Sequence, residues 1–322
     1  MKTVMTVKKG AVLAMLLSAT MMSSAHALTV YTAGPGSLAK SLASGYEKKT
    51  GVKVNIFQAT TGKVMARLDA EQANPQADVL ISASWDTAED LHQRGWLLPY
   101  QSANADKVPA NLKSADYVAQ GISALGIVWN SKSGTPEPKE WRDLTEAAFK
   151  DKVTTPDPAL SGASLDLLIG LQNGMGDKAW ALFDELKKNG MVVSGPNAQA
   201  VTPVMQGAKA AVFGAVDYVS YGNIDQGESL KVIFPASGTV IAPRPMMILK
   251  TTAHADDAKA FVDYVLSPEG QALVAGAWLM PARSDIPAKR PLLNELKILP
   301  TTSDGSSERS TVLSRFNTLF AQ

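Results

Sequence analysis

The order of strand-like and helix-like segments is the feature that most constrains the fold of this chain. Residues 28–32 and 52–56 predict strands, and residues 37–46 between them predict a helix with Ser37 as its N-cap. A short buried strand follows at 77–81. Strands that alternate with helices in this way pair in parallel and are covered on both faces. The sequence therefore predicts an α/β fold.

Two long apolar strands divide the chain into two sets of these units. They span residues 122–129 and 240–249, and a second set of predicted helices, including 141–149, lies between them. We therefore expect two lobes with a cleft between them. The predicted division assigns residues 28–122 and 240–298 to lobe 1, and residues 123–239 and 299–322 to lobe 2.

The first 27 residues have the composition of a signal peptide. Three lysines precede an apolar run at 11–22, and residues 25–27 read AHA, the small-x-small pattern that signal peptidase cuts after. The run is too short to cross a hydrocarbon core of about 30 Å as a helix. No cysteine follows it, which excludes lipid attachment at the cut site. We expect export to the periplasm and a mature chain that begins at Leu28.

Net charge and cysteine content exclude several classes of protein. The chain has 31 Lys+Arg and 30 Asp+Glu, and removal of the three signal-peptide lysines leaves 28 against 30, a net charge of −2. This balance gives no electrostatic reason to expect nucleic acid or an anionic membrane surface as a partner. The absence of cysteine excludes thiol nucleophiles, Cys-ligated zinc and iron–sulfur clusters.

The mature chain carries no familiar catalytic constellation. Its two histidines, His92 and His254, lie at a helix end and in a turn, outside any HExxH pattern, and neither a GxSxG elbow nor a P-loop occurs. We therefore expect no enzyme, no catalytic residues, no cofactor and no resident metal. An exported hydrolase, with carboxylates assembled across the fold, is the enzymatic alternative.

Loops rich in Gly, Ser and Thr precede several predicted helices. They are residues 34–37, 60–63, 82–84 and 161–164. The first N–H groups of a helix are unpaired and carry partial positive charge, and small residues let a ligand approach them. Each loop by itself is an ordinary helix cap. Four such loops facing one crevice would form an anion-binding site.

Eight segments occur in an order typical of one family. They are VYTAGPGSLAKSLASGYEKKTGVKV, NPQADVLISAS, GISALGIVWN, PKEWRDL, SGAS, VMQGAKAAVFG, GTVIAPRP and AKAFVDYVLSPEGQALV. In this order they resemble the class II periplasmic solute-binding proteins of ABC importers, in the branch of ferric-ion, 2-aminoethylphosphonate, sugar-phosphate and polyamine binders. The resemblance implies two lobes and two hinge strands that close about a solute and then dock on permease transmembrane subunits. We expect the protein to act as a monomer.

The resemblance also implies a test for ferric ion. Ferric binders hold iron with a His, a Glu, two adjacent tyrosines and an anion. No His stands at the family's position here, and the tyrosine pair falls on Asp217-Tyr218, with Tyr221 nearby. The anion-holding segment is kept as Ser161-Gly162-Ala163, and Asn197 matches a polar position of the cleft. These matches favour a phosphonate or phosphorylated solute, with Fe³⁺ held by Tyr218 and Tyr221 as the alternative.

The predicted site combines the helix starts with side chains from lobe 2 and the second long strand. Asp217 would accept from a ligand amine or hydroxyl, and Tyr218 or Tyr221 would stack or hydrogen-bond. Arg244, between two prolines, would neutralise ligand charge or lie on the surface. The predicted ligand-binding residues are Gly36, Ser37, Thr60, Thr61, Ser84, Ser161, Gly162, Ala163, Ser164, Asn197, Asp217, Tyr218, Tyr221 and Arg244.

Expression of the full chain tests the signal peptide. We expect intact-mass analysis of the periplasmic fraction to find a protein that begins at Leu28, because residues 25–27 present the cleavage pattern. An uncleaved protein retained in the membrane would contradict this prediction.

Overall fold

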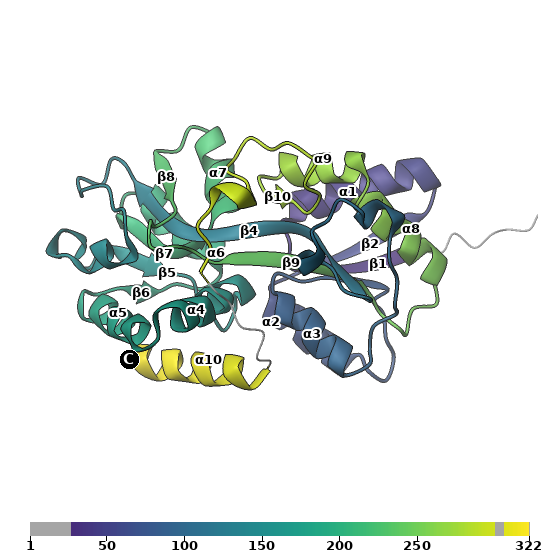
Figure 1. The fold of residues 1–322 in the computed structure, drawn as a ribbon, viewed down its shortest axis with the longest axis horizontal. Helices are drawn as coiled ribbons and strands as arrows, with labels where there is room; N and C mark the ends of the chain where they lie inside the picture. Colours follow the sequence, from purple (N-terminus) through teal and green to yellow (C-terminus); the bar gives the residue numbers. More distant parts are fainter. Residues whose placement is uncertain (1–26, 300–305, 322) are drawn as a thin grey trace, which may run out of the picture.

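The structure is a computed structural model that describes residues 27–299 and 306–321 (Figure 1). The predicted signal peptide lies outside the described residues, except for Ala27, which begins the first strand. No helix within the described ranges is both long and apolar enough to cross a membrane.

Ten strands form one mixed sheet, which confirms the α/β prediction. Eight of them lie in the order β2, β1, β3, β9, β4, β7, β5, β6, and β8 and β10 pair with β4 off this path. The strands are β1 (Ala27–Thr32), β2 (Lys53–Gln58), β3 (Val79–Ile81), β4 (Tyr117–Asn130), β5 (Val153–Thr155), β6 (Val192–Val193), β7 (Ala211–Val216), β8 (Leu230–Ile233), β9 (Ile241–Ile248) and β10 (Met280–Pro281).

Parallel pairing occurs within each end of the sheet. β1 pairs in parallel with β2 and β3, and β5 pairs in parallel with β6 and β7. The two long strands β4 and β9 run antiparallel to each other and to their other neighbours. The structure therefore has two parallel units joined through two long strands, the arrangement of a two-lobed class II binding protein.

Helices cover both faces of the two units. Their bounds are α1 (Gly36–Thr50), α2 (Thr61–Ala70), α3 (Trp85–Gln93), α4 (Gly162–Met175), α5 (Asp177–Lys188), α6 (Asn197–Met205), α7 (Asp217–Asp225), α8 (Ala255–Val265), α9 (Pro268–Gly276) and α10 (Ser306–Phe320). Short 3₁₀ turns lie at Ala103–Ala105, Ala110–Leu112, Trp141–Thr145, Ala147–Phe149 and Leu293–Glu295.

Two local predictions were wrong. The predicted helix at 141–149 is a pair of 3₁₀ turns, because the backbone of Glu146 between them is extended, with φ −71° and ψ 155°. Ser37 is not the N-cap of α1, because the helix already begins at Gly36 and its N-cap is Pro35. The φ of Pro35, −59°, lies in the range that its ring allows, so proline supplies the turn into this helix.

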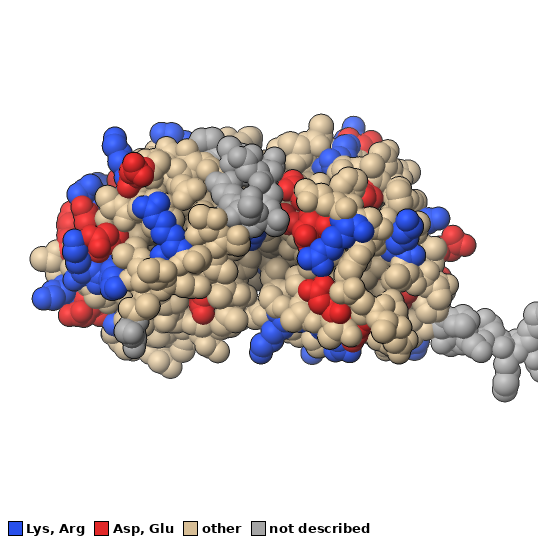
Figure 2. All heavy atoms as spheres, turned by 90° about the horizontal axis from the view of Figure 1, so that it is seen from below, with Lys and Arg blue, Asp and Glu red and all other residues tan. Residues whose placement is uncertain are grey.

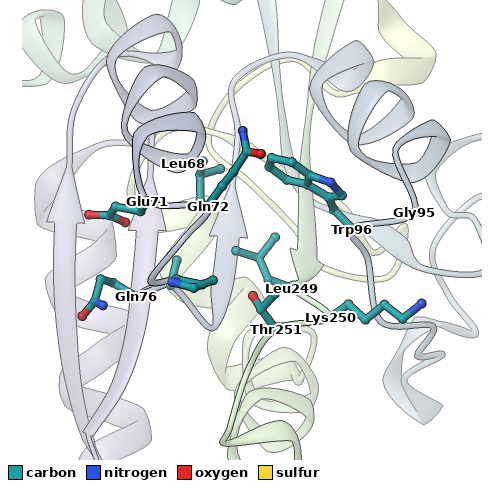
Figure 3. Close-up of a pocket in the computed structure, with 11 residues that line it drawn as sticks. Leu68, Glu71, Gln72, Gln76, Gly95, Trp96, Leu249, Lys250 and Thr251 are labelled. Atoms are coloured by element: carbon teal, nitrogen blue, oxygen red, sulfur yellow. The ribbon is translucent and has the colours of Figure 1, made fainter.

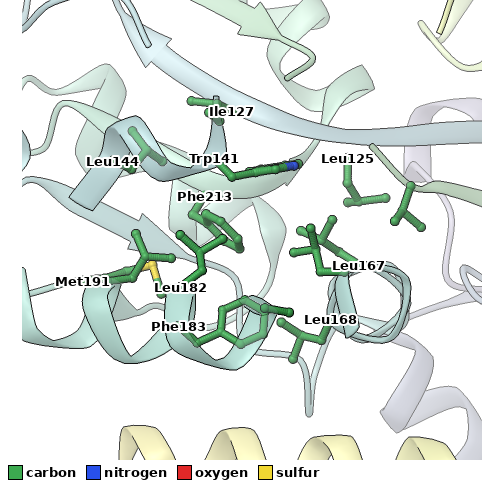
Figure 4. Close-up of a cluster of buried hydrophobic side chains, with 14 of the residues drawn as sticks. Leu125, Ile127, Trp141, Leu144, Leu167, Leu168, Leu182, Phe183, Met191 and Phe213 are labelled. Carbon is green, nitrogen blue, oxygen red and sulfur yellow. The ribbon is translucent and has the colours of Figure 1, made fainter. Parts of the chain in front are cut away.

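Each lobe has its own hydrophobic core. In lobe 2, Figure 4 shows Phe213 between Trp141 and Phe183, with ring centroids 4.8 and 6.0 Å away. Val312 and Phe316 bring α10 into this core. The lobe 1 core packs β1, α1 and β9 against α8 and α9, through residues that include Leu28, Leu42, Ile248, Phe261 and Val274.

β4 crosses from one core to the other within two residues. Ala124 packs in the lobe 1 core and is the last residue of β4 to pair with β9, opposite Ile241. Leu125 packs in the lobe 2 core and pairs with Val216 of β7. We propose that the lobe boundaries lie where the sequence placed them, near 122 and 240.

Truncation of a central lobe 2 side chain tests this core. Phe213→Ala is expected to lower the free energy of unfolding by about 3–5 kcal/mol, because it removes a buried ring and leaves a cavity. Val192→Ala is the control, since Val192 is 42% exposed and should change stability by less than about 0.5 kcal/mol. Equal urea midpoints for the two variants would contradict the central place of Phe213 in the lobe 2 core.

Candidate functional site

The starts of three helices meet between the lobes. A Cβ atom added to Gly162, at the start of α4, would lie 2.9 Å from Ser84 Cβ and 3.3 Å from Thr61 Oγ1. One added to Gly62 would lie 3.3 Å from the carbonyl oxygen of Ala159. Lobe 1 and lobe 2 are therefore in close contact here, and a side chain at position 162 would displace Ser84.

The hydroxyls at these helix starts have different partners. Ser161 caps α4 by accepting from the N–H of Ser164 at 3.1 Å, and Thr60 caps α2 by accepting from the N–H of Lys63 at 3.5 Å. Ser84 makes no such cap; its Oγ donates to Asp166 Oδ1 across the lobes at 3.0 Å. Gly36 and Ser37 begin α1, where Ser37 is exposed.

Arg244 of β9 is the cation of the predicted site, and it is only 2% exposed. Its Nη1 donates to the carbonyl oxygen of Ala33 at 3.3 Å, and its Nη2 donates to Tyr218 Oη at 3.2 Å. Its Nε is buried without a partner. Within residues 27–299 and 306–321 no carboxylate forms an ion pair with it. The interpretation of Arg244 as a surface residue was therefore wrong.

Asn197, at the start of α6, also has an unused polar atom. Its Nδ2 donates to Ser161 Oγ at 2.8 Å, whereas its Oδ1 is buried without a partner. Buried polar atoms are almost always hydrogen-bonded, so an unpaired one is a notable feature of a site. This hydrogen bond thus brings together two predicted ligand-binding residues, Ser161 at the N-cap of α4 and Asn197 at the start of α6.

Asp217 does not have the role that the sequence predicted. Its carboxylate is fully buried and pairs with Arg290, and it also accepts from the N–H groups of Ala124 at 3.0 Å and Tyr218 at 2.8 Å. The protein itself thus supplies donors to both oxygens. A ligand amine would have to displace one of these donors, so we assign Asp217 a structural role.

Tyr221 lies one helical turn beyond Tyr218 and has different neighbours. Its ring stacks on Trp278 at 6.0 Å between centroids, and the Arg290 guanidinium lies 5.1 Å from the ring centroid. Burial raises the pKa of Tyr221 to about 12; Arg290 opposes this shift and Asp217 adds to it. Its phenol is therefore protonated at neutral pH.

Several residues of this region were not predicted from the sequence. Arg290 and Trp278 lie in the return segment after α9, and Asp166 and Arg309 lie between the lobes. None of them stands in a recognisable motif, so only the three-dimensional arrangement identifies them. No cluster of three or more His, Cys, Asp or Glu suited to a metal ion occurs in the described part of the chain.

Three cavities lie near these elements. One of about 380 Å³ opens between the lobes, and Trp85, Asp166, Pro243 and Arg309 are among the residues that line it. A second, of about 300 Å³, is lined by Asp86, Arg309 and the predicted ligand-binding residue Thr61, among others. A third, of about 240 Å³, lies beyond the end of α2, where Leu68 and Leu249 lie near Trp96 (Figure 3). None of the predicted ligand-binding residues lines the cavity of Figure 3, so it is not part of the predicted site.

Replacement of Asp217 tests its structural role. Asp217→Ala is expected to lower the free energy of unfolding by about 3–5 kcal/mol, because it leaves the Arg290 guanidinium buried without its partner. Asp225→Ala, at an exposed position of the same helix, should change stability by less than about 0.5 kcal/mol. A loss below 1 kcal/mol for Asp217→Ala in urea unfolding would contradict the role.

The sequence is similar to those of known bacterial solute-binding proteins. The family model "Bacterial extracellular solute-binding protein" matches residues 74–304. An uncharacterized protein of Haemophilus influenzae is 30% identical over 264 residues, which are 78% of this chain and 75% of that protein. A "Putative 2-aminoethylphosphonate-binding periplasmic protein" of Salmonella typhimurium is 26% identical over 254 residues, 75% of this chain and 73% of that protein.

Solved structures show the same fold. The periplasmic binding protein AfuA of Actinobacillus pleuropneumoniae, with fructose-6-phosphate bound, has a TM-score of 0.82 at 24% identity and covers 90% of this chain and 97% of its own. Iron-bound HitA of Pseudomonas aeruginosa has a TM-score of 0.81 at 21% identity, covering 91% and 99%. The chain belongs to the bacterial extracellular solute-binding protein family, whose members serve ABC importers.

Proposed function

We propose that this protein captures a small phosphonate or phosphorylated solute between its two lobes and delivers it to the transmembrane subunits of an ABC importer. Arg244 carries the proposal, because it is a buried guanidinium without a carboxylate partner in the described chain. Removing an ion from water costs several kcal/mol unless a charge of opposite sign compensates for it. An anionic ligand would supply that charge.

The free Nε of Arg244 indicates how the anion would bind. Guanidinium groups bind phosphate oxygens with parallel N–H donors, which gives both strength and orientation. Hydrogen bonds hold Nη1 and Nη2 on Ala33 and Tyr218, so these contacts orient the group before a solute arrives. The unpaired Nε is then available to a phosphate or phosphonate oxygen.

Helix starts would complete the anion site. We propose that phosphate oxygens accept from the first N–H groups of α1, α2 and α4, and that Asn197 and Tyr218 contact the rest of the solute. Acidic and basic side chains are interspersed on the face in Figure 2. Selection for an anion would therefore come from the buried site and not from the charge of this face. The proposed contacts are Gly36, Ser37, Thr60, Thr61, Ser84, Ser161, Gly162, Ala163, Ser164, Asn197, Tyr218, Tyr221 and Arg244.

Closure would couple solute binding to transport. The proposed contacts come from α1, α2 and α3 on one lobe and from α4, α6 and α7 on the other. A solute that touches both lobes stabilises the closed arrangement over the open one. The closed protein would then be the form that docks on the permease.

A ferric-ion carrier is the second candidate, because iron-bound HitA shares the fold. The site offers Tyr218 and Tyr221 as phenolate ligands, but Tyr218 Oη already accepts from the Arg244 guanidinium. A trivalent cation at that phenol would face a buried positive charge. The anionic solute is therefore the better match.

Ligand screening by thermal unfolding tests the proposal. We expect 2-aminoethylphosphonate or a sugar phosphate to raise the Tm by several degrees at about 100 times its Kd, through binding linkage. Arg244→Met should weaken that binding at least about 30-fold, since it removes a buried charge partner. Arg142→Met, at a guanidinium that is 76% exposed in lobe 2, should bind like the parent.

The same screen includes the competing ligands. A response to ferric ion, with a red-orange colour after loading, and none to the phosphorylated compounds would replace the proposed function with iron transport. Turnover of phosphate esters by pure protein would indicate a hydrolase. Equal affinities of Arg244→Met and Arg142→Met for a phosphorylated solute would contradict the role of Arg244.

A further inference from the structure

One arginine links the two lobes outside the proposed solute contacts. Nη1 of Arg309 donates to Asp166 Oδ1 at 2.6 Å and also to Asp86 Oδ2. Asp86 lies on α3 of lobe 1, whereas Asp166 lies on α4 of lobe 2. Ser84, the residue before α3, donates to the same oxygen of Asp166 at 3.0 Å. Four side chains thus form a single network across the interface, and of these only Ser84 is also a proposed solute contact.

Arg309 belongs to lobe 2. It lies near the start of α10, and Val312 and Phe316 of that helix pack in the lobe 2 core. In Figure 1, α10 runs beneath α4 and α5, and its N-terminal end points toward α3. Separation of the lobes must therefore break the contact of Arg309 with Asp86 and the contact of Ser84 with Asp166.

The surroundings of Arg309 are acidic. Asp86, Glu89 and Asp166 line the 380 Å³ cavity between the lobes, where Arg309 is the one basic residue among the lining residues. Burial raises the pKa of Asp166 to about 6; Arg309 opposes this shift and Asp86 adds to it. Burial also raises the pKa of Glu89. Without the guanidinium, closing the lobes would either bring two buried carboxylates together or require Asp166 to take up a proton, and both are unfavourable.

We propose that Asp86, Arg309 and Asp166 form an interlobe clasp, which stabilises the closed arrangement without touching the solute. The guanidinium attracts a carboxylate of each lobe, and it can hold both only when the lobes are closed. A binding-competent state that is more populated before the solute arrives raises the apparent affinity in proportion. The clasp therefore influences affinity for any solute, and the inference does not depend on the solute's identity.

The distance between the lobes tests the clasp directly. The chain has no cysteine, so Gln93→Cys on α3 and Lys178→Cys on α5 provide two exposed spin-label sites in an otherwise label-free protein. Pulsed electron–electron double resonance measures the distance between the two labels. Without solute, it should find a population with the short distance of the closed arrangement in this doubly labelled parent. Arg309→Met should lower the closed-to-open ratio about tenfold, within the usual range of coupling between sites.

Three further variants separate the clasp from an effect on folding. Asp86→Asn leaves α10 unchanged and should shift the distances in the same direction, and Arg309→Lys should restore part of the closed population. Arg315→Met is the matched control on α10, because the Arg315 guanidinium lies 4.1 Å from the Trp180 ring centroid within lobe 2. The distance distribution of Arg315→Met should match that of the parent.

Two results would overturn the inference. One is a solute-free parent with no closed population. The other is an unchanged distance distribution in both Arg309→Met and Asp86→Asn. Neither result bears on Arg244 or on the anionic solute, so failure of the clasp and failure of the proposed function are distinguishable.

Discussion

The structure depends on a single strand that is shared by two cores. β4 pairs with β9 through Ala124 and with β7 from Leu125 onward. The N–H of Ala124 donates to Asp217, whose carboxylate is held by Arg290. The buried ion pair thus lies at the point where β4 passes from one lobe to the other. Replacing either partner would leave a charge buried at this crossing.

The proposed solute site is built on the same strands. Arg244 projects from β9, beside the crossing, and Tyr218 follows Asp217 at the start of α7. The ion pair that holds the crossing therefore also positions the phenol that accepts from Arg244. The contacts thus run without a break from β4 through the ion pair and Tyr218 to Arg244 on β9.

The contacts between the lobes are of two kinds. Near Gly62 and Gly162 the contact is steric, because a Cβ atom at position 162 would overlap Ser84 and one at position 62 would press on the carbonyl oxygen of Ala159. Around Arg309 the contact is electrostatic and joins carboxylates of both lobes. Both kinds of contact would have to separate for the lobes to move apart.

The sequence by itself determined the α/β class, the two long strands and the helix starts at Thr60 and Ser161, because apolar periodicity and capping residues are local signals. It also selected Arg244 from its place between two prolines. Only the tertiary structure showed that Arg244 is buried without a carboxylate partner. It also showed that Asp217 pairs with Arg290 and that Asp86 pairs with Arg309. The partners of these two ion pairs are separated by 73 and 223 positions along the chain. Burial and long-range pairing arise only when distant segments pack together, and no local pattern encodes them.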